Sequence, residues 1–377
     1  MDNPALGKVV LLEKAIRYVK QYSSDIVLLL VVNMKTSTDY LNQYDAATEF
    51  FSQDELSDYL NALDMLSIYH DISYGEDDFI RKIGNNYFEK YKQQYKIVFN
   101  TTGSKHIRSR SALIPAVCEI AGLSYASNDI LTCSILENKI HANSLLTHYG
   151  FPVPPSWYFY PDSGWLDDCP PQDRKLIIKP SEESASIGIT QESVGFFSNE
   201  FESIVREVCD IMQEPVMVQE FIDGWEVEVP VVHVDERIAL PPMGIEMDKD
   251  KYLNDRYLSF DTVFSDNYNY YRFDQIDSKL AEALSNVAEN SSRVLDLRGT
   301  IRVDFRVNNK GQYFITDYNN SPHWTRFHSV AKSLSSIGFE YPYLFCLILY
   351  NSLNSLCQKS VLAKGHLSYP TRKTGKN

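Results

Sequence analysis

The sequence predicts an α/β protein in which a small, mostly parallel sheet is followed by two α+β units. Three observations predict this fold class. Apolar runs typical of buried strands alternate with amphipathic helical stretches from about residue 8 to 130. Helix and strand patterns then alternate through two further units. Near the C-terminus, two runs of alternating apolar and polar residues flank Asn-Asn-Lys-Gly, which is typical of a β-hairpin.

The N-terminal unit is expected over 1–128. A capping box, Ser52-Gln-Asp-Glu55, predicts the start of one of its helices, and Gly122 predicts the end of another. The expected elements are, in order, a helix at 8–21, a strand at 25–32, a helix at 52–66, a strand at 95–100, a helix at 111–121 and a strand at 123–126. This order is typical of a parallel sheet.

A central unit is expected over 129–222, a C-terminal unit over 223–357 and a basic tail over 358–377. The central unit should contain helices at 138–148 and 200–212 and strands at 176–180 and 216–222. The C-terminal unit should contain a strand at 226–234, a tyrosine-rich loop, a helix at 274–296, the hairpin within 300–325 and a closing helix at 341–356.

Composition and charge exclude several classes of function. A formal charge of −14 without a basic patch argues against a nucleic-acid partner. The longest apolar run, Ile26 to Val32, is too short to cross a bilayer, so we expect no membrane partner. Six scattered cysteines form neither a zinc motif nor a disulfide framework. These features predict a cytoplasmic protein with reduced thiols.

The hairpin carries the most informative polar residues. Arg302 and Asp304 lie two apart on its first strand, and Asp317 and Asn319 do so on its second, so each pair shares a face. One or two carboxylates together with substrate phosphates are the usual environment of Mg²⁺. The competing interpretation is a solvated polar face on a two-stranded ribbon.

Two lysines flank a small polar loop in the central unit. Lys139 begins a helix, and Lys179 ends a strand just before the loop 181–188. Lysine side chains and loop N–H groups can together hold phosphates. No P-loop and no Gly-x-Gly-x-x-Gly motif is present. Either lysine alone is also compatible with a solvated surface.

A strand–turn–strand segment follows at 219–226. A carboxylate on such an edge can accept hydrogen bonds from a ribose, and the preceding strand can offer backbone groups to a base. The alternative is a hairpin with charged edges.

Taken in order, these segments resemble the ATP-grasp superfamily, and most closely its D-alanine–D-alanine ligase branch. The resemblance covers about 109–325. The segments at 109–119, 121–125 and 150–155 look like first-domain motifs of that branch. It implies an N-terminal parallel-sheet domain followed by two α+β subdomains that sandwich ATP, and a dimer formed through the first domain.

The resemblance also implies a role for each candidate residue. Lys139 and Lys179 would contact the phosphates of ATP, and Ser184 and Ser186 of the central loop would belong to the same ATP-binding set. Glu226 would bind the ribose, and Glu220, Phe221 and Ile222 would line the adenine pocket. The Mg²⁺ ligands would be Asp304, Asp317 and Asn319. Arg302 would stabilise the negative charge of the reacting species, and Arg256 and Tyr257 would belong to a closing loop.

Departures from the family pattern concern the substrate. The usual glutamate of the metal set is Asp317, the usual serine of the central loop is Ala185, and the usual lysine of the closing loop is Arg256. His323 replaces a glycine and is expected to act as a pocket wall, a donor to a carboxylate or a general base. Nearby, Arg326 and His328 are expected to add positive charge.

The expected function is therefore an ATP-dependent carboxylate–amine ligase that joins amino-acid-like substrates through an acyl phosphate, in natural-product or modified-peptide biosynthesis. Two alternatives stay open. One is a true D-alanine–D-alanine ligase, and the other is a non-catalytic ATP-binding regulatory protein. An ATP-grasp enzyme of another branch would need extra domains for which this chain has little room.

Overall fold

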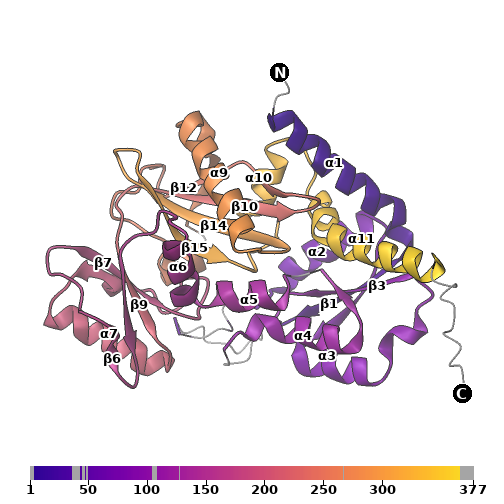
Figure 1. Cartoon of the computed structure of the whole chain (residues 1–377), viewed down its shortest axis with the longest axis horizontal. Coiled ribbons are helices and arrows are strands. Elements are labelled where there is room, and N and C mark those ends of the chain that lie inside the picture. The colour runs from indigo at the N-terminus through magenta and orange to yellow at the C-terminus, as the bar shows by residue number, and fades with distance from the viewer. Residues whose placement is uncertain are drawn as a thin grey trace, which may run out of the picture.

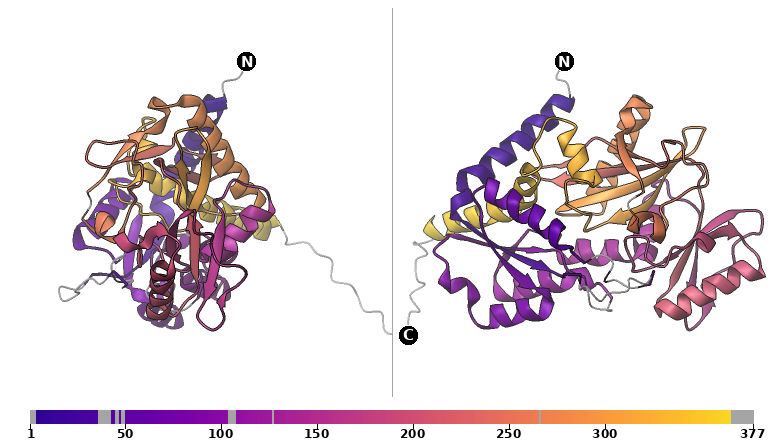
Figure 2. Two further views of the ribbon diagram at one scale, coloured as in Figure 1. Left: turned by 90° about the vertical axis from the view of Figure 1, so that its left-hand side faces the viewer. Right: turned by 180° about the vertical axis from the view of Figure 1, so that it is seen from behind.

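A computed structural model describes residues 4–35, 43–44, 47, 50–103, 108–126, 128–265 and 267–365. Its three sheets lie in three units along the chain. In Figure 1 the N-terminal unit lies at the lower right, the central unit at the lower left, and the C-terminal unit above and between them. The view from behind in Figure 2 shows the same arrangement.

The N-terminal unit is built on a four-stranded sheet in the order β2-β1-β3-β4, with every pair parallel. Its elements are α1 (Pro4–Tyr22), β1 (Ile26–Val32), α2 (Gln53–Met65), β2 (Tyr69–Tyr74), α3 (Gly75–Gly84), β3 (Tyr95–Asn100), α4 (Leu113–Ala121) and β4 (Ser124–Tyr125). The capping box that opens α2 is present, and Gly122 ends α4 in a left-handed conformation. The parallel sheet predicted from the sequence is confirmed.

The central unit contains a five-stranded antiparallel sheet in the order β6-β5-β9-β7-β8. Its elements are β5 (Ser156–Tyr160), β6 (Gly164–Trp165), β7 (Lys175–Pro180), β8 (Val194–Phe196), α7 (Asn199–Met212) and β9 (Val216–Glu220). Apolar residues of α7, among them Val205 and Val208, pack on the buried side chains of β7 and β9. Because β9 ends at Glu220, Phe221 and Ile222 lie just beyond the strand that we expected to contain them.

The C-terminal unit contains a six-stranded sheet in the order β13-β12-β10-β14-β15, with β11 also paired to β10. Its elements are β10 (Trp225–His233), β11 (Arg237–Ala239), β12 (Met243–Glu246), α8 (Phe260–Phe264), β13 (Asn269–Arg272), α9 (Ser278–Val294), β14 (Thr300–Val307), β15 (Tyr313–Asn319), α10 (Ser329–Ser335) and α11 (Tyr343–Gly365). The predicted hairpin is β14–β15. Helix α11 continues to Gly365, beyond the end that we expected near 356, and the rest of the expected tail lies outside the described residues.

Two helices that precede the central sheet pack on the C-terminal sheet instead. They are α5 (Ile130–Glu137) and α6 (Lys139–His148). Leu136 of α5 and Leu146 of α6 share one hydrophobic core with β10, β14 and α9. The segment expected to open the central unit therefore contributes to the core beside it, and this places Lys139 next to the hairpin.

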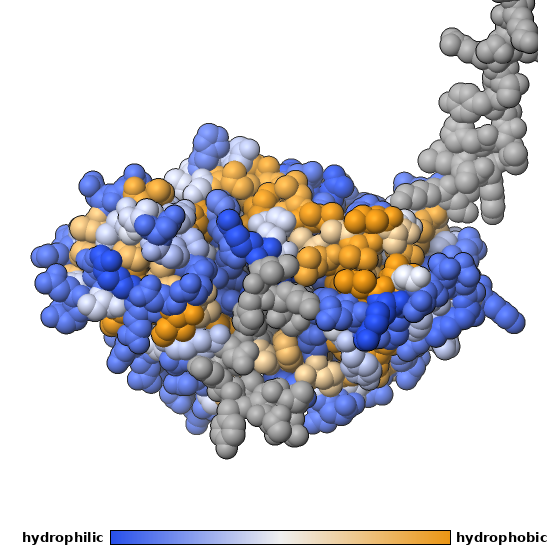
Figure 3. All heavy atoms as spheres, turned by 90° about the horizontal axis from the view of Figure 1, so that it is seen from below, coloured by the Kyte–Doolittle hydropathy of each residue, from blue (hydrophilic) through white to orange (hydrophobic). Residues whose placement is uncertain are grey.

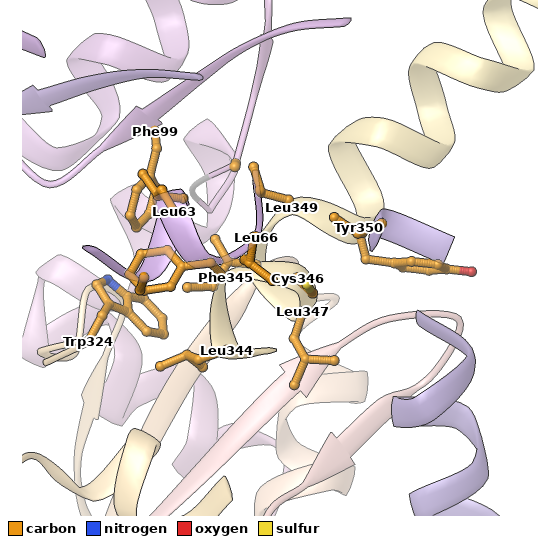
Figure 4. Close-up of a cluster of buried hydrophobic side chains, with 14 of the residues drawn as sticks. Leu63, Leu66, Phe99, Trp324, Leu344, Phe345, Cys346, Leu347, Leu349 and Tyr350 are labelled. Carbon is orange, nitrogen blue, oxygen red and sulfur yellow. The ribbon is translucent and has the colours of Figure 1, made fainter. Parts of the chain in front are cut away.

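The largest hydrophobic core joins the N-terminal unit to α11. Phe99 of β3 and Phe345 of α11 lie edge to face, with ring centroids 6.3 Å apart, and Trp324 lies 6.5 Å from Phe99. Figure 4 shows these rings together with Leu63 of α2 and Leu344 of α11. Trp324 is 5% exposed, so the chain just after the hairpin is fixed in the core of the first unit. No helix among the described residues has the length and apolar character needed to cross a bilayer.

Candidate active site

A cavity of about 490 Å³ lies where the three units meet. Its lining includes Thr102 of the N-terminal unit, Lys179 of the central unit and Asp304 of the C-terminal unit. Most of the residues singled out in the sequence contribute to it. These are Lys139, Lys179, Ser184, Ser186, Glu220, Phe221, Ile222, Glu226, Tyr257, Arg302, Asp304, Asp317, Asn319 and His323.

The hairpin brings its four polar residues together by strand register. Asp304 lies directly opposite Asp317, and Arg302 lies opposite Asn319. The Arg302 guanidinium donates two hydrogen bonds to the Asp304 carboxylate, both 2.7 Å long. This bidentate pair fixes the plane of the guanidinium and leaves Nη1 directed elsewhere.

A buried glutamate that the sequence reading missed takes that remaining position. Glu228 Oε2 lies 3.4 Å from Arg302 Nη1, and the register of β10 and β14 places Glu228 opposite Asp304. Burial raises the pKa of Glu228 to about 7, although Arg302 opposes the shift. A signal was available, because Glu228 lies two residues after Glu226 and so shares its face of the strand.

The two aspartates of the hairpin lie close enough for the negative charge of one to affect the pKa of the other. Burial raises the pKa of Asp304, Arg302 opposes this, and the negative charge of Asp317 adds to the rise. Asp317 Oδ2 lies 3.6 Å from Lys139 Nζ. Asn319 Oδ1 accepts a hydrogen bond from the Ser321 N–H at 2.8 Å, which orients the carboxamide. Two carboxylates with mutual repulsion, plus a carboxamide oxygen, form a donor set that suits a hard cation such as Mg²⁺.

The two lysines reach the same place from opposite sides. Lys179 Nζ is buried and donates to Gln219 Oε1 at 3.0 Å and to the Thr316 carbonyl at 2.9 Å. Burial lowers the pKa of Lys179 to about 8, and the negative charge of Asp317 counters part of this shift. Lys139 Nζ donates to the Glu183 carbonyl in the central loop. Both ammonium groups are thus held near Asp317, as a phosphate site requires.

The central loop and the closing loop are joined to each other. Ser186 Oγ donates to the Leu258 carbonyl at 2.7 Å, and the Phe260 N–H donates to the Ile189 carbonyl at 2.9 Å. The Tyr257 hydroxyl donates to the Thr190 carbonyl at 2.7 Å. The structure therefore shows a closed arrangement in which 257–260 covers the cavity.

Arg306 connects the closing loop to the expected nucleotide end, and it too was missed. It is 5% exposed, donates to Glu226 Oε2 at 2.9 Å and to the Ile222 carbonyl at 2.9 Å, and lies over the Phe221 ring at 4.9 Å. It also donates to the carbonyl of Asn254 at 3.0 Å. Arg306 follows Asp304 by two residues, so the alternation that identified Arg302 and Asp304 also pointed to it.

The charged groups of two residues expected in the site, Arg256 and Glu220, are engaged in ion pairs. Arg256 does not line the cavity, because its guanidinium donates to Asp250 at 2.7 Å and lies 3.6 Å from Asp248. The Glu220 carboxylate pairs with Arg174. Glu220 therefore borders the cavity with its carboxylate paired, and of the two residues expected in the closing loop only Tyr257 lines the cavity.

His323 and His328 also line the cavity, and their rings are stacked with centroids 4.7 Å apart. Burial lowers the pKa of His328 to about 3, and His323 and Arg302 add to the shift, so His328 does not carry the positive charge that we expected. Arg326 does not supply it either, because its guanidinium pairs with Asp58 of α2. The expectation of positive charge beside His323 was therefore wrong for His328, whereas the charge of Arg326 is balanced by Asp58.

One further pair was beyond sequence reasoning. Arg110 donates two hydrogen bonds to the Glu183 carboxylate, at 3.0 and 2.8 Å, and both side chains are buried. The contact joins the N-terminal unit to the central loop across 73 positions of the chain. No local sequence pattern predicts it.

Known proteins with similar sequences include D-alanine–D-alanine ligases. The model for the D-ala D-ala ligase C-terminus matches residues 173–349. A D-alanine–D-alanine ligase of Cupriavidus necator is 25% identical over 230 residues, which is 60% of this chain and 67% of the relative. One of Aquifex aeolicus is 22% identical over 238 residues, 63% of this chain and 76% of the relative.

Solved structures extend the likeness over most of the chain. The D-alanine–D-alanine ligase of Bacillus anthracis complexed with ATP superposes with a TM-score of 0.65 at 14% identity, covering 88% of this chain and 99% of that one. The VanG D-Ala:D-Ser ligase of Enterococcus faecalis gives a TM-score of 0.59 at 19% identity, covering 86% and 99%. The fold class and the resemblance inferred from the sequence are both confirmed.

Proposed function

We propose that this chain, which is a D-alanine–D-alanine ligase-like ATP-grasp ligase, joins a carboxylate to an amine on amino-acid-like substrates. The observation that carries the proposal is the convergence of three cationic side chains and two carboxylates in one cavity. Lys139, Lys179 and Arg302 lie around the cross-strand pair Asp304 and Asp317. Cations so placed can neutralise phosphate charge while the two carboxylates hold a metal.

The reaction has two steps. A carboxylate oxygen of the donor attacks the terminal phosphorus of ATP, the bond to the bridging oxygen breaks, and ADP leaves. The amine nitrogen of the acceptor then attacks the carbonyl carbon of the acyl phosphate, the amine loses a proton, and inorganic phosphate leaves. No side-chain nucleophile is needed.

Each cationic group has a separate task in these steps. Lys179 and Lys139 would contact the phosphate oxygens of ATP. Arg302 is held flat by Asp304 and would face the charge that develops on the acyl carbon's oxygen. Glu226 would receive the ribose, and Phe221 and Ile222 would border the base.

The donor set of the hairpin fits a magnesium ion. Asp304, Asp317 and Asn319 would hold it, and when bound it neutralises phosphate charge. Asp317 is one methylene shorter than the usual glutamate, but its carboxylate lies within ion-pair distance of Lys139, at the centre of the site.

The substrate end departs from what a D-alanine ligase needs, so we propose a divergent pair of amino-acid-like substrates, in natural-product or modified-peptide biosynthesis. Ala185 lacks the hydroxyl of the usual serine. His323 lines the cavity with an imidazole where the family has a glycine. Tyr268 and Tyr270 also line the cavity and add to its aromatic surface.

Phosphate release tests the proposal. Purified protein with ATP and Mg²⁺ is presented with a pairwise panel of L- and D-amino acids and dipeptides, and mass spectrometry identifies any product. We expect release that requires two substrates, yields an adduct lighter by one water, and disappears in Asp317→Ala. D-Ala-D-Ala formed at a ligase-like rate would refute the divergent substrates and support the true D-alanine–D-alanine ligase. ATP binding without release for any pair would favour the regulatory alternative.

Two further parts of the proposal concern the assembly and its location. The exposed large apolar side chains include Ile120 of the N-terminal unit at 90% and Leu131 of α5 at 57%, and Figure 3 shows hydrophobic residues gathered on the face seen from below. These support a homodimer, which light scattering of the full chain would detect as twice the mass of one chain. All six cysteines are free, which suits a cytoplasmic location.

A further inference from the structure

Three side chains with metal-binding groups meet in the cavity. Glu55, His323 and His328 each present one ligand atom, and these atoms all lie within 4.8 Å of one another. All three residues are partly buried and line the cavity. They come from α2 and from the segment between β15 and α10, which are more than 260 positions apart in the chain.

Rigid structure holds each of them. Glu55 Oε2 accepts the Ser52 N–H at 2.8 Å in the capping box of α2, which leaves Oε1 for the cavity. The Trp324 N–H donates to the Tyr59 hydroxyl at 3.1 Å, and its ring is buried in the main core, so the backbone beside His323 is fixed.

The backbone of His328 is fixed as well. Its N–H donates to the Thr325 carbonyl at 3.2 Å, and its carbonyl accepts from Lys332 in α10 at 3.0 Å. The three ligand positions are therefore set by secondary structure and core packing, as a metal site requires.

Neighbouring carboxylates offset the positive charges around this cluster. The Arg302 guanidinium, whose positive charge helps to lower the pKa of His328, is bound by Asp304 at 2.7 Å and lies 3.4 Å from Glu228. Arg326 is paired with Asp58. The carboxylate of Glu55 brings a negative charge to the cluster itself.

We propose that Glu55, His323 and His328 form a second metal site, which binds a divalent transition-metal ion of the Zn²⁺ type. Two imidazole nitrogens and one carboxylate oxygen are the protein ligands of many zinc sites that keep one position open. The all-oxygen set of Asp304, Asp317 and Asn319 suits Mg²⁺ instead, so the two sites select different ions.

The three ligand atoms would have to move closer together to bind one ion. Ligand atoms around a tetrahedral Zn²⁺ lie about 3.4 Å apart, given bonds of about 2.0–2.1 Å. The ligand atoms of this cluster lie within 4.8 Å of one another, so side-chain rotation would have to bring them closer when an ion binds. The open position then faces the same cavity as Arg302, where an amino-acid carboxylate is a suitable fourth ligand.

Direct titration tests the site without any ligase substrate. The full chain carrying Cys169→Ser, which removes an exposed thiol, is titrated with ZnCl₂ in competition with a chromophoric chelator, in the absence of nucleotide and Mg²⁺. We expect one tight equivalent. His323→Ala and His328→Ala should each weaken it at least about tenfold, since one of three protein ligands is lost. His148→Ala, an exposed histidine at the end of α6, is the matched control and should bind as before.

Two additional measurements keep the result decisive. Glu55→Gln retains an acceptor for the Ser52 N–H, so it should fold and still lose zinc affinity. Co²⁺ added in place of Zn²⁺ should give visible absorption bands that disappear in His328→Ala. Absence of a tight equivalent, or equal affinity in His323→Ala, His328→Ala and His148→Ala, would overturn the site. Because no ATP is present, neither outcome bears on the ligase reaction.

Discussion

The affinity of this protein for ATP should fall as the pH rises through 8, because of one buried lysine. The pKa of Lys179 is lowered to about 8 by burial, so its ammonium group begins to lose its proton well below the range of an exposed lysine. Only the protonated form attracts a phosphate. About nine-tenths of Lys179 is protonated at pH 7 and about one-tenth at pH 9, so the Kd for Mg-ATP should rise about tenfold between them.

Isothermal titration of the full chain with Mg-ATP measures this change and needs no knowledge of the two substrates. Lys179→Arg is the control, because a guanidinium stays charged over the whole range. Its Kd should remain nearly constant from pH 7 to 9. The reasoning is refuted if the wild-type Kd changes less than twofold over that range, or if Lys179→Arg shows the same slope as the wild type.

Three other substitutions probe the hairpin and its neighbours. Arg302→Ala should lower substrate-dependent phosphate release by about 10²–10³-fold, because one stabilising cation is lost; release within threefold of wild type would contradict this. Arg306→Met should weaken Mg-ATP binding and lower the free energy of unfolding by about 3–5 kcal/mol, since Glu226 loses its buried partner. An unchanged urea midpoint would argue against that. Gly224→Ala should cost more than about 2 kcal/mol in the same urea titration, because its Cβ would lie 1.8 Å from the Val307 carbonyl oxygen; a wild-type midpoint would show that the turn adjusts.

Local patterns in the sequence predicted much of the architecture. Strand β3 and the start of α2 follow from an apolar run and a capping box, and the hairpin from alternation around a turn. The same alternation, carried two residues further, would have found Glu228 and Arg306. Strand β2 was missed because its side chains are mostly half-exposed and polar, so it lacks the apolar run of a buried strand.

Other features depend on contacts between distant segments. Arg326 pairs with Asp58, and Arg110 pairs with Glu183, across separations that no periodicity spans. The packing of α5 and α6 on the C-terminal sheet is likewise set by tertiary structure. The individual boundaries of the three units and the roles of the site residues therefore remain predictions to be tested.

The seal between the two loops over the cavity has a kinetic consequence. Among the described residues, hydrogen bonds from Ser186 to Leu258, from Tyr257 to Thr190 and from Phe260 to Ile189 hold it. At the usual net strength of such bonds, separating the loops costs about 2–4 kcal/mol. An open form would then make up roughly one molecule in thirty to one in a thousand. ATP and the substrates must pass through that minor population, so the rate at which the loops part sets an upper limit on the speed of entry at high ligand concentration.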